Sequence, residues 1–344
     1  MLRTVLPVAT LALAAPAVFA GSLDPPAAPQ PTPGPEPRTP ISSLPVSIEA
    51  PGSYYLTASL TGVTGSSGIE ISSDAVTIDL GGFPIIGVPG AGSGIVVEGT
   101  RNGLAVRNGA LRSWPGGGLV GTGAQGSQFA DLRVTGCSTA GLLVGNNNTV
   151  ESCVALSNTA PGITVGTGTT VIGCVSRSNS LGIDAGSGCV IVDCAVEANF
   201  TAGIRAAQRA TVLRCSVSNS NSDGINAGQG STVADCTVAG IVFDGIEVST
   251  DCQVRNNTVD GAGSGGTGNA GILVTGNDCR IDGNAVTDSD IGIQVTGTGN
   301  LIVRNSASGN TPNFDIVADN STGTVFNVAG VGLGSANAWA NFEF

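Results

Sequence analysis

The chain has 344 residues, of which 53 are glycine, and it contains no histidine. Its formal net charge is −12, and its 13 basic residues are scattered arginines. This charge argues against nucleic acid or an anionic membrane as a partner, because both require clustered Lys and Arg. Only 11% of the residues are charged and 4% are aromatic, so a surface of Ser, Thr, Asn and Gly is expected. Neutral glycans, cations and protein surfaces remain as partners.

Residues 1–20 have the pattern of a secretory signal peptide. Arg3 supplies the positive end, an apolar segment follows, and Val18 to Ala20 form the cleavage site. The apolar segment is shorter than the roughly 20 residues that a membrane-spanning helix needs. We therefore expect an exported protein, whether secreted, periplasmic or on the cell surface, with no membrane span once the signal is removed.

Residues 21–45 are rich in proline and lack the apolar content that a folded segment needs. Such a composition is typical of an extended linker. We expect this segment to tether the folded part or to hold it away from a surface.

A step of glycine followed by an aliphatic residue recurs from residue 68 onward, at intervals of about 21 residues. A short strand after each glycine and a constant period are typical of a solenoid. A leucine-rich repeat is excluded because its leucine consensus and helical segments are missing. The steps begin at Gly68, Gly94, Gly118, Gly141, Gly162, Gly182, Gly203, Gly224, Gly245, Gly271 and Gly292.

A second apolar run follows each step about nine residues later, as in Val150-x-x-Cys153 and Val254-x-x-Asn257. Its first, fourth and sixth places are restricted, whereas its second place varies as a solvent-facing place would. Because side chains on a strand alternate with a period of two, two inward places three residues apart require a bend between them. The sequence therefore predicts three short strands per coil.

The sequence resembles the right-handed parallel β-helix repeat proteins of the pectate-lyase-like superfold. The resemblance rests on Pro51-Gly-Ser-Tyr-Tyr-Leu56, on Val76 to Gly82, and on the repeated steps. It implies an all-β, single-stranded right-handed parallel β-helix of about 12 coils over residues 46–325, with a C-terminal cap or tail at residues 326–344. Pro51 to Thr57 is interpreted as the N-terminal cap. Some members of this superfold cleave acidic polysaccharides, and others have no catalytic activity.

Five cysteines occupy one place of the second run, so coil stacking would align them in an inward column. An exported protein with nine cysteines suggests disulfides. Parallel neighbours are about 4.8 Å apart, however, which exceeds the roughly 3.5–4.5 Å between the Cβ atoms of a relaxed disulfide. We favour buried thiols, with disulfides and thiol-bound metal as alternatives. The column holds Cys153, Cys174, Cys194, Cys215 and Cys236.

The residue after each Gly-aliphatic step is expected to point outward from its strand. In four successive coils these residues are polar and are followed two places later by small residues, so that a large ligand could approach them. We predict that this row binds a glycan. It consists of Asp184, Arg205, Asn226 and Glu247.

Asp223 and Asp244 each precede the glycine of their coil and should lie one above the other. Two carboxylates about 5 Å apart can provide the acid and the base of glycoside cleavage. Both match aspartates of the polygalacturonase motifs, but Phe243 replaces another, and the Gly-His-Gly and Arg-Ile-Lys motifs of that family are absent. The resemblance thus implies a β-helix that is not a polygalacturonase. The alternative role of both aspartates is to start a tight turn by bonding local backbone.

No cofactor is expected. Calcium stays open as a ligand because four C-terminal aspartates offer hard oxygen atoms, although no recognisable loop spacing organises them. These are Asp278, Asp282, Asp288 and Asp290.

Three functions remain open. We favour an exported, non-catalytic β-helix scaffold that contacts polysaccharide or the cell envelope. The alternatives are a glycoside hydrolase that uses the Asp223 and Asp244 pair and a surface-layer or adhesion module. The sequence names neither the glycan nor the oligomeric state.

Overall fold

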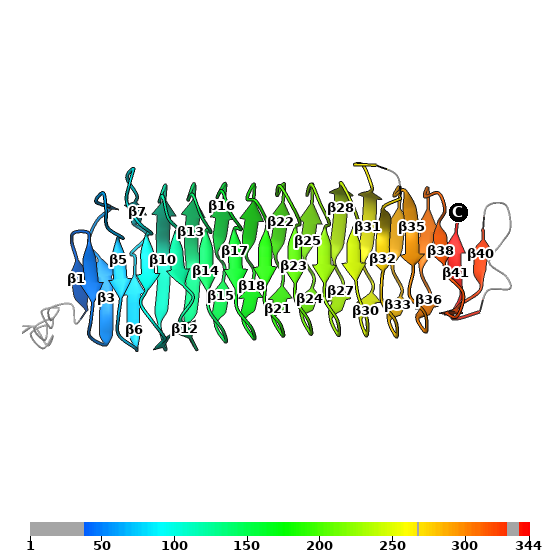
Figure 1. The fold of residues 1–344 in the computed structure, drawn as a ribbon, viewed down its shortest axis with the longest axis horizontal. Coiled ribbons are helices and arrows are strands. Elements are labelled where there is room, and N and C mark those ends of the chain that lie inside the picture. Colours follow the sequence, from blue (N-terminus) through cyan, green and yellow to red (C-terminus); the bar gives the residue numbers. More distant parts are fainter. Residues whose placement is uncertain (1–37, 267, 329–336) are drawn as a thin grey trace, which may run out of the picture. The chain divides into compact units, whose positions relative to one another are not determined.

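A computed structural model describes residues 38–266, 268–328 and 337–344 (Figure 1). The predicted signal peptide and the first part of the linker, to residue 37, lie outside the described residues. Residues 38–344 form a single unit of stacked β-coils. The described part of the chain contains strands and turns, and no helix in it is long and apolar enough to cross a bilayer.

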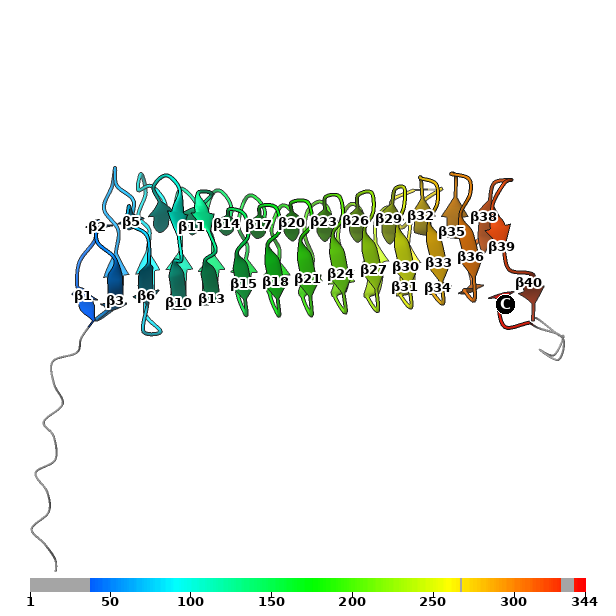
Figure 2. The same ribbon diagram turned by 90° about the horizontal axis from the view of Figure 1, so that it is seen from below.

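The first strand of every coil belongs to a 13-stranded parallel sheet, visible along the rod in Figure 2. Eleven of its strands follow a Gly-aliphatic step, and one further strand at each end brings the number to 13, close to the predicted 12 coils. The sheet contains β2 (Val46–Ile48), β5 (Ile69–Ile71), β8 (Ile95–Val97), β11 (Leu119–Gly121), β14 (Leu142–Val144), β17 (Ile163–Val165), β20 (Ile183–Ala185), β23 (Ile204–Ala206), β26 (Ile225–Ala227), β29 (Ile246–Val248), β32 (Ala270–Val274), β35 (Ile291–Val295) and β38 (Phe314–Ile316).

The second and third strands of each coil form two columns of one 26-stranded sheet, because β10 and β13 run through both columns. The second strands are β1 (Thr39–Ile41), β3 (Gly52–Leu56), β6 (Val76–Asp79), β10 (Ala105–Arg112), β13 (Gln128–Thr135), β15 (Thr149–Glu151), β18 (Thr170–Ile172), β21 (Val190–Val192), β24 (Thr211–Leu213), β27 (Thr232–Ala234), β30 (Gln253–Arg255), β33 (Arg280–Asp282), β36 (Leu301–Val303) and β39 (Ser321–Thr322).

The third strands are β4 (Leu60–Thr61), β7 (Pro84–Ile86), β16 (Val154–Leu156), β19 (Val175–Arg177), β22 (Ala195–Glu197), β25 (Ser216–Ser218), β28 (Thr237–Ile241), β31 (Thr258–Ala262), β34 (Ala285–Thr287), β37 (Ser306–Ser308), β40 (Val325–Asn327) and β41 (Asn341–Glu343). A small separate pair, β9 (Arg101–Asn102) and β12 (Ala124–Gln125), completes the set. The predicted fold class and the three strands per coil are confirmed.

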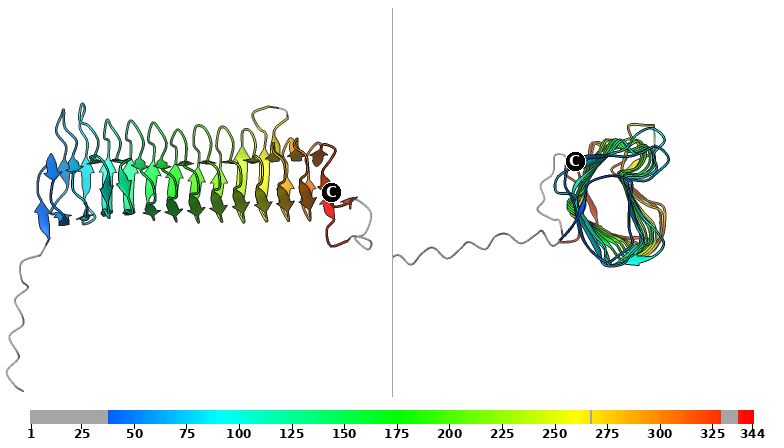
Figure 3. Two further views of the ribbon diagram at one scale, coloured as in Figure 1. Left: turned by 60° about the horizontal axis from the view of Figure 1, so that its bottom comes forward. Right: turned by 90° about the vertical axis from the view of Figure 1, so that its left-hand side faces the viewer.

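Successive coils stack in register, so that residues in the same place of the repeat pair with each other. Ile204 pairs with Ile183 in the preceding coil and with Ile225 in the following one. The predicted bend between second and third strands is made by a residue with a positive φ, such as Asp193 or Arg214. Viewed along the rod, the coils superpose around one interior (Figure 3). Stacking therefore satisfies backbone groups along the axis and leaves the interior to apolar side chains.

The glycine of the Gly-aliphatic step is required by close packing between coils. A Cβ atom on Gly224 would lie 2.5 Å from the carbonyl oxygen of Gly245, and one on Gly203 would lie 2.7 Å from that of Gly224. Any larger residue would push adjacent coils apart. The step thus marks a point of close vertical contact in each coil.

The column of five cysteines lies inside the rod, and all nine cysteines of the chain are free and buried. The Sγ atoms reach backbone carbonyls, as in Cys194 Sγ to Val192 O at 3.3 Å. Burial raises the pKa of the Cys137 and Cys189 thiols. The predicted burial of the cysteine column is confirmed, and the absence of disulfides stays a prediction.

Asparagine continues the cysteine column toward the C-terminus and forms an internal ladder. The Asn284 backbone N–H donates to Asn305 Oδ1 at 2.9 Å, and the Asn284 side-chain amide donates to Val254 O at 2.9 Å. A second ladder, which the sequence analysis missed, joins Asn158, Asn179 and Asn199. Buried amides here satisfy backbone groups at the coil corners.

The ends of the rod differ from the predicted boundaries. Pro51 to Thr57 is not the outermost segment, because β3 pairs with β1 on one side and with β6 on the other. The strand β1 lies within the predicted linker, so the coils begin at Thr39 and not at residue 46. At the other end β41 pairs with both β37 and β40 within the predicted cap.

Candidate functional site

The predicted polar row lies at the centre of the 13-stranded sheet. Asp184 pairs with Arg205, Arg205 with Asn226, and Asn226 with Glu247 on four successive strands, β20 to β29. Arg205 donates to both carboxylate oxygens of Asp184, at 2.9 and 2.7 Å. The two residues therefore neutralise each other at one end of the row.

Asn226 joins the row to the carboxylates beside it. Its side-chain amide donates to Glu247 Oε2 and also, at 3.4 Å, to Asp223 Oδ2. Asp223 lies in the turn before β26, three residues upstream of Asn226. One amide thus holds two carboxylates of different coils close together.

Asp244 occupies the equivalent turn of the next coil, before β29. Its Oδ1 accepts a hydrogen bond from the backbone N–H of Ala270 at 2.7 Å. Ala270 is the first residue of β32, one coil further along. The bond therefore links two coils, whereas the alternative turn interpretation required a bond to local backbone.

Oxygen atoms of Asp223, Asp244 and Glu247 all lie within 4.8 Å of one another, and the three side chains are half-buried. We call these residues the carboxylate cluster. Desolvation raises the pKa of Asp244, and the charge of Asp223 raises it further against the lowering effect of the Ala270 N–H. Desolvation and the charges of Asp223 and Asp244 raise the pKa of Glu247. Both carboxyls therefore hold their protons to higher pH than usual.

The carboxylate cluster is the one group in the described part of the chain whose three or more side chains lie close enough to share a metal ion. The four aspartates considered for calcium do not form such a group. Asp282 is bound by Arg280 and Arg304, which neutralise it and lower its pKa. Calcium binding stays a prediction, and carboxylate oxygens of the cluster suit it better than the C-terminal aspartates.

Two exposed phenylalanines, for which the repeat pattern predicts no function, lie in turns that precede strands of the 13-stranded sheet. Phe200 is 70% exposed and Phe243 is 43% exposed. Their positions in turns otherwise occupied by small polar residues are the signal that would have identified them. We use "turn edge" for the turns at residues 157–162, 178–182, 198–203, 219–224 and 242–245.

Backbone hydrogen bonds align the turn edge vertically. The N–H of Thr201 donates to Ser180 O, that of Ser222 to Thr201 O, and that of Phe243 to Ser222 O. An open groove of about 620 Å³ lies at the N-terminal part of this edge. Its lining consists of Ser157, Asn158, Thr159, Ser178, Ser180 and Phe200.

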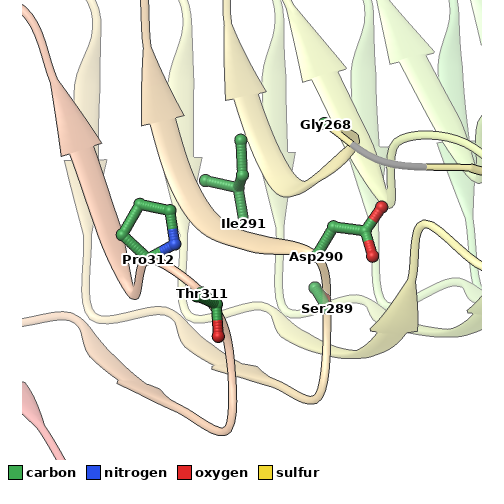
Figure 4. Close-up of a pocket in the computed structure, with 6 residues that line it drawn as sticks. All are labelled: Gly268, Ser289, Asp290, Ile291, Thr311 and Pro312. Carbon is green, nitrogen blue, oxygen red and sulfur yellow. The ribbon is translucent and has the colours of Figure 1, made fainter.

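A second hollow, of about 400 Å³, lies beyond the cluster on the later turns (Figure 4). Asp290 turns its carboxylate toward the connection that contains Gly268. Its Oδ2 is buried and makes no hydrogen bond within the described residues. Phe200, the carboxylate cluster and this hollow thus follow one side of the rod.

Comparison with known families agrees with this architecture. A family model described as a right handed beta helix region matches residues 166–308, which include the polar row and the carboxylate cluster. The chain has the fold of a right-handed parallel β-helix. Within the match the Gly-aliphatic steps are 21 residues apart, except for the interval of 26 residues between Gly245 and Gly271.

Solved β-helix structures resemble this β-helix protein in fold. The A-module of the Azotobacter vinelandii mannuronan C-5 epimerase AlgE4 superposes with a TM-score of 0.66 at 15% identity, over 79% of this chain and 91% of that module. The A-module of the epimerase AlgE6 from the same organism gives 0.51 at 13% identity, over 88% of each chain. No curated protein matches the β-helix protein by sequence.

Proposed function

We propose that this β-helix protein is an exported scaffold that contacts polysaccharide through the polar row and the carboxylate cluster. The observation that carries the proposal is the register of β20, β23, β26 and β29, which presents a hydrogen-bonding side chain in each of four successive coils. Small residues two places later leave the row open. The signal peptide predicted for residues 1–20 fits an extracellular or periplasmic ligand.

The polysaccharide assignment also draws on the comparisons. The two A-modules that share the fold come from epimerases named for mannuronan, a polysaccharide. A long sheet with a regular vertical repeat suits a polymer ligand, because each coil offers the same spacing of about 4.8 Å. Binding would rest on hydrogen bonds made by Asn226 and by the carboxylate cluster.

Affinity gel electrophoresis of the full chain through gels that contain different polysaccharides tests this proposal. Asn226→Ala should weaken binding about two- to tenfold, because it removes a side-chain donor at the centre of the row. Gln294→Ala is the matched control, since Gln294 occupies the same column on β35. The proposal would be contradicted if no polysaccharide slowed the migration of the wild type, or if wild type and Asn226→Ala were slowed equally.

A second function is favoured by the geometry of the carboxylate cluster. Its oxygens lie within 4.8 Å of one another, closer to the roughly 5–5.5 Å of retaining glycosidases than to the roughly 6.5–9.5 Å of inverting ones. The raised pKa of Asp244 suits a general acid, and Asp223 would be the nucleophile. In this alternative the protein is a glycoside hydrolase.

Release of reducing ends from the same polysaccharides separates the two functions. If the chain is a hydrolase, Asp223→Asn and Asp244→Asn should each lower the rate at least a hundredfold. Asp193→Asn, which changes an aspartate on the strand-to-strand bend outside the cluster, should leave the rate unchanged. Absence of hydrolysis with every polysaccharide would contradict the hydrolase function and leave the scaffold as the remaining function.

A further inference from the structure

The groove beside Phe200 differs in chemistry from the carboxylate cluster. Its six lining residues carry hydroxyl, amide and aromatic groups, and none carries a charge. The amide of Asn158 is bound within the internal ladder. The four hydroxyls can donate and accept hydrogen bonds with sugar hydroxyls, and the exposed ring offers an apolar face for stacking. The groove therefore has the composition of a binding site for an uncharged sugar.

The charges near the turn edge disfavour an acidic sugar. Arg177, at the end of β19, lies 3.5 Å from Glu197, and Arg205 forms a two-bond pair with Asp184. Each of these cations already has a carboxylate partner. The next coils add Asp223, Asp244 and Glu247, so a uronate chain along this edge would meet unpaired negative charge.

Aromatic rings mark two places along the edge. Phe200 lies in the groove, and Phe243 lies two coils further along, in the turn that carries Asp244. The coil between them carries Asp223. A polymer laid along the turn edge would thus contact Phe200, then the turn with Asp223, and then the turn that carries both Phe243 and Asp244. The other exposed Phe and Trp side chains in the described ranges, Trp339 and Phe344, lie near the C-terminus.

We propose that the turn edge binds an uncharged polysaccharide, with the groove at Phe200 as one sugar subsite and Phe243 as a second stacking platform. This inference rests on the proposed polysaccharide function and adds the substrate class and the site. It also separates this protein from the mannuronan epimerases that share its fold, because mannuronan is a polymer of uronate and thus acidic. An oligosaccharide that contacts both Phe200 and Phe243 would cross the turn that carries Asp223.

Affinity electrophoresis of the full chain in dextran, mannan, xylan, alginate and polygalacturonate tests the inference, each run with EDTA and again with calcium. An uncharged polymer should retard the wild type more than either acidic polymer does. Phe200→Ala should weaken that binding about five- to tenfold, the size expected for loss of one stacked ring. Phe344→Ala, which removes an exposed ring near the C-terminus, should bind as wild type.

The outcomes distinguish this inference from the proposed function. Stronger binding of alginate or polygalacturonate, with or without calcium, would overturn the uncharged substrate class and leave polysaccharide binding intact. If Asn226→Ala weakens binding and Phe200→Ala does not, the groove is not a sugar subsite, and the proposed polysaccharide function still stands. Absence of binding to all five polymers would overturn both proposals.

Discussion

At the scale of single residues, the close approach of three carboxylates in the carboxylate cluster lowers the stability of the fold. Asp244 and Glu247 lose part of their hydration, and each lies in the field of other negative charges. Folding therefore favours their protonated forms. Such a cluster opposes folding at neutral pH, which is a common property of functional sites.

The pH dependence of stability follows from these shifts. Below the ordinary carboxyl pKa both states are protonated, and the cluster costs nothing. Between the ordinary pKa and the raised pKa, the unfolded chain has released these protons while the folded chain still holds them. The free energy of unfolding therefore falls as pH rises across that window. Glu247→Gln should raise Tm at pH 7 by about 1–3 °C and by less at pH 4. Thermal melts that compare it with Glu70→Gln, in the same column on β5, check this. An unchanged pH profile would contradict it.

The exposed phenylalanines show a limit of residue-level prediction. Sequence alone places Phe200 and Phe243 in turns, but it does not tell whether a ring folds back over the rod or projects from it. Their exposed fractions come from the structure. The bond between Asp244 and Ala270 could not be predicted either, because the interval between Gly245 and Gly271 includes an insertion whose path the repeat does not determine.

At the scale of elements, the coil corners depend on buried asparagines and closely stacked glycines. Asn284 is 1% exposed and bonds to Asn257 and Asn305 on either side. The repeat predicted the column that contains it, since Cys occupies this place in five successive coils and Asn in the next three. The second ladder was not predicted because Ser220 replaces asparagine in it and the following coils have Ile241 and Ala262.

Loss of one ladder amide should destabilise the whole stack. Asn284→Ala leaves the Asn257 N–H and the Val254 carbonyl without their buried partners. We expect a loss of about 2–4 kcal/mol in the free energy of unfolding. Asn221→Ala, at an exposed turn position, should cost under about 0.5 kcal/mol. Urea unfolding followed by circular dichroism measures both, and equal midpoints would contradict the ladder's role.

At the scale of the whole molecule, the period of the sequence determines which residues meet. Apolar places, the Gly-aliphatic step and the polar row follow from a period near 21 residues, so fold class and row could be predicted. The ends could not, because β1 and β41 join the stack through pairings outside the repeat. Partnering within the row, such as the Arg205 and Asp184 pair, depends on side-chain conformation that a period does not specify.

Burial of the cysteines inside the rod leads to a prediction about the reactivity of their thiols. All nine thiols are buried, with exposed fractions of 2% or less. Native protein should therefore react with almost no thiol reagent, and unfolding in guanidinium without reductant should release all nine. Few reactive thiols after unfolding would show that disulfides form and would contradict the free column.

Stacked coils that place carboxylates of different coils in one cluster are the basis of the proposed site. Carbon-detected NMR titration of the side-chain carboxyls in the full chain tests this directly. Asp244 and Glu247 should titrate above their ordinary pKa values, and Asp223→Asn should lower the pKa of both, because Asp223 raises each of them through its charge. Ordinary titration of both residues, unaffected by Asp223→Asn, would contradict the account.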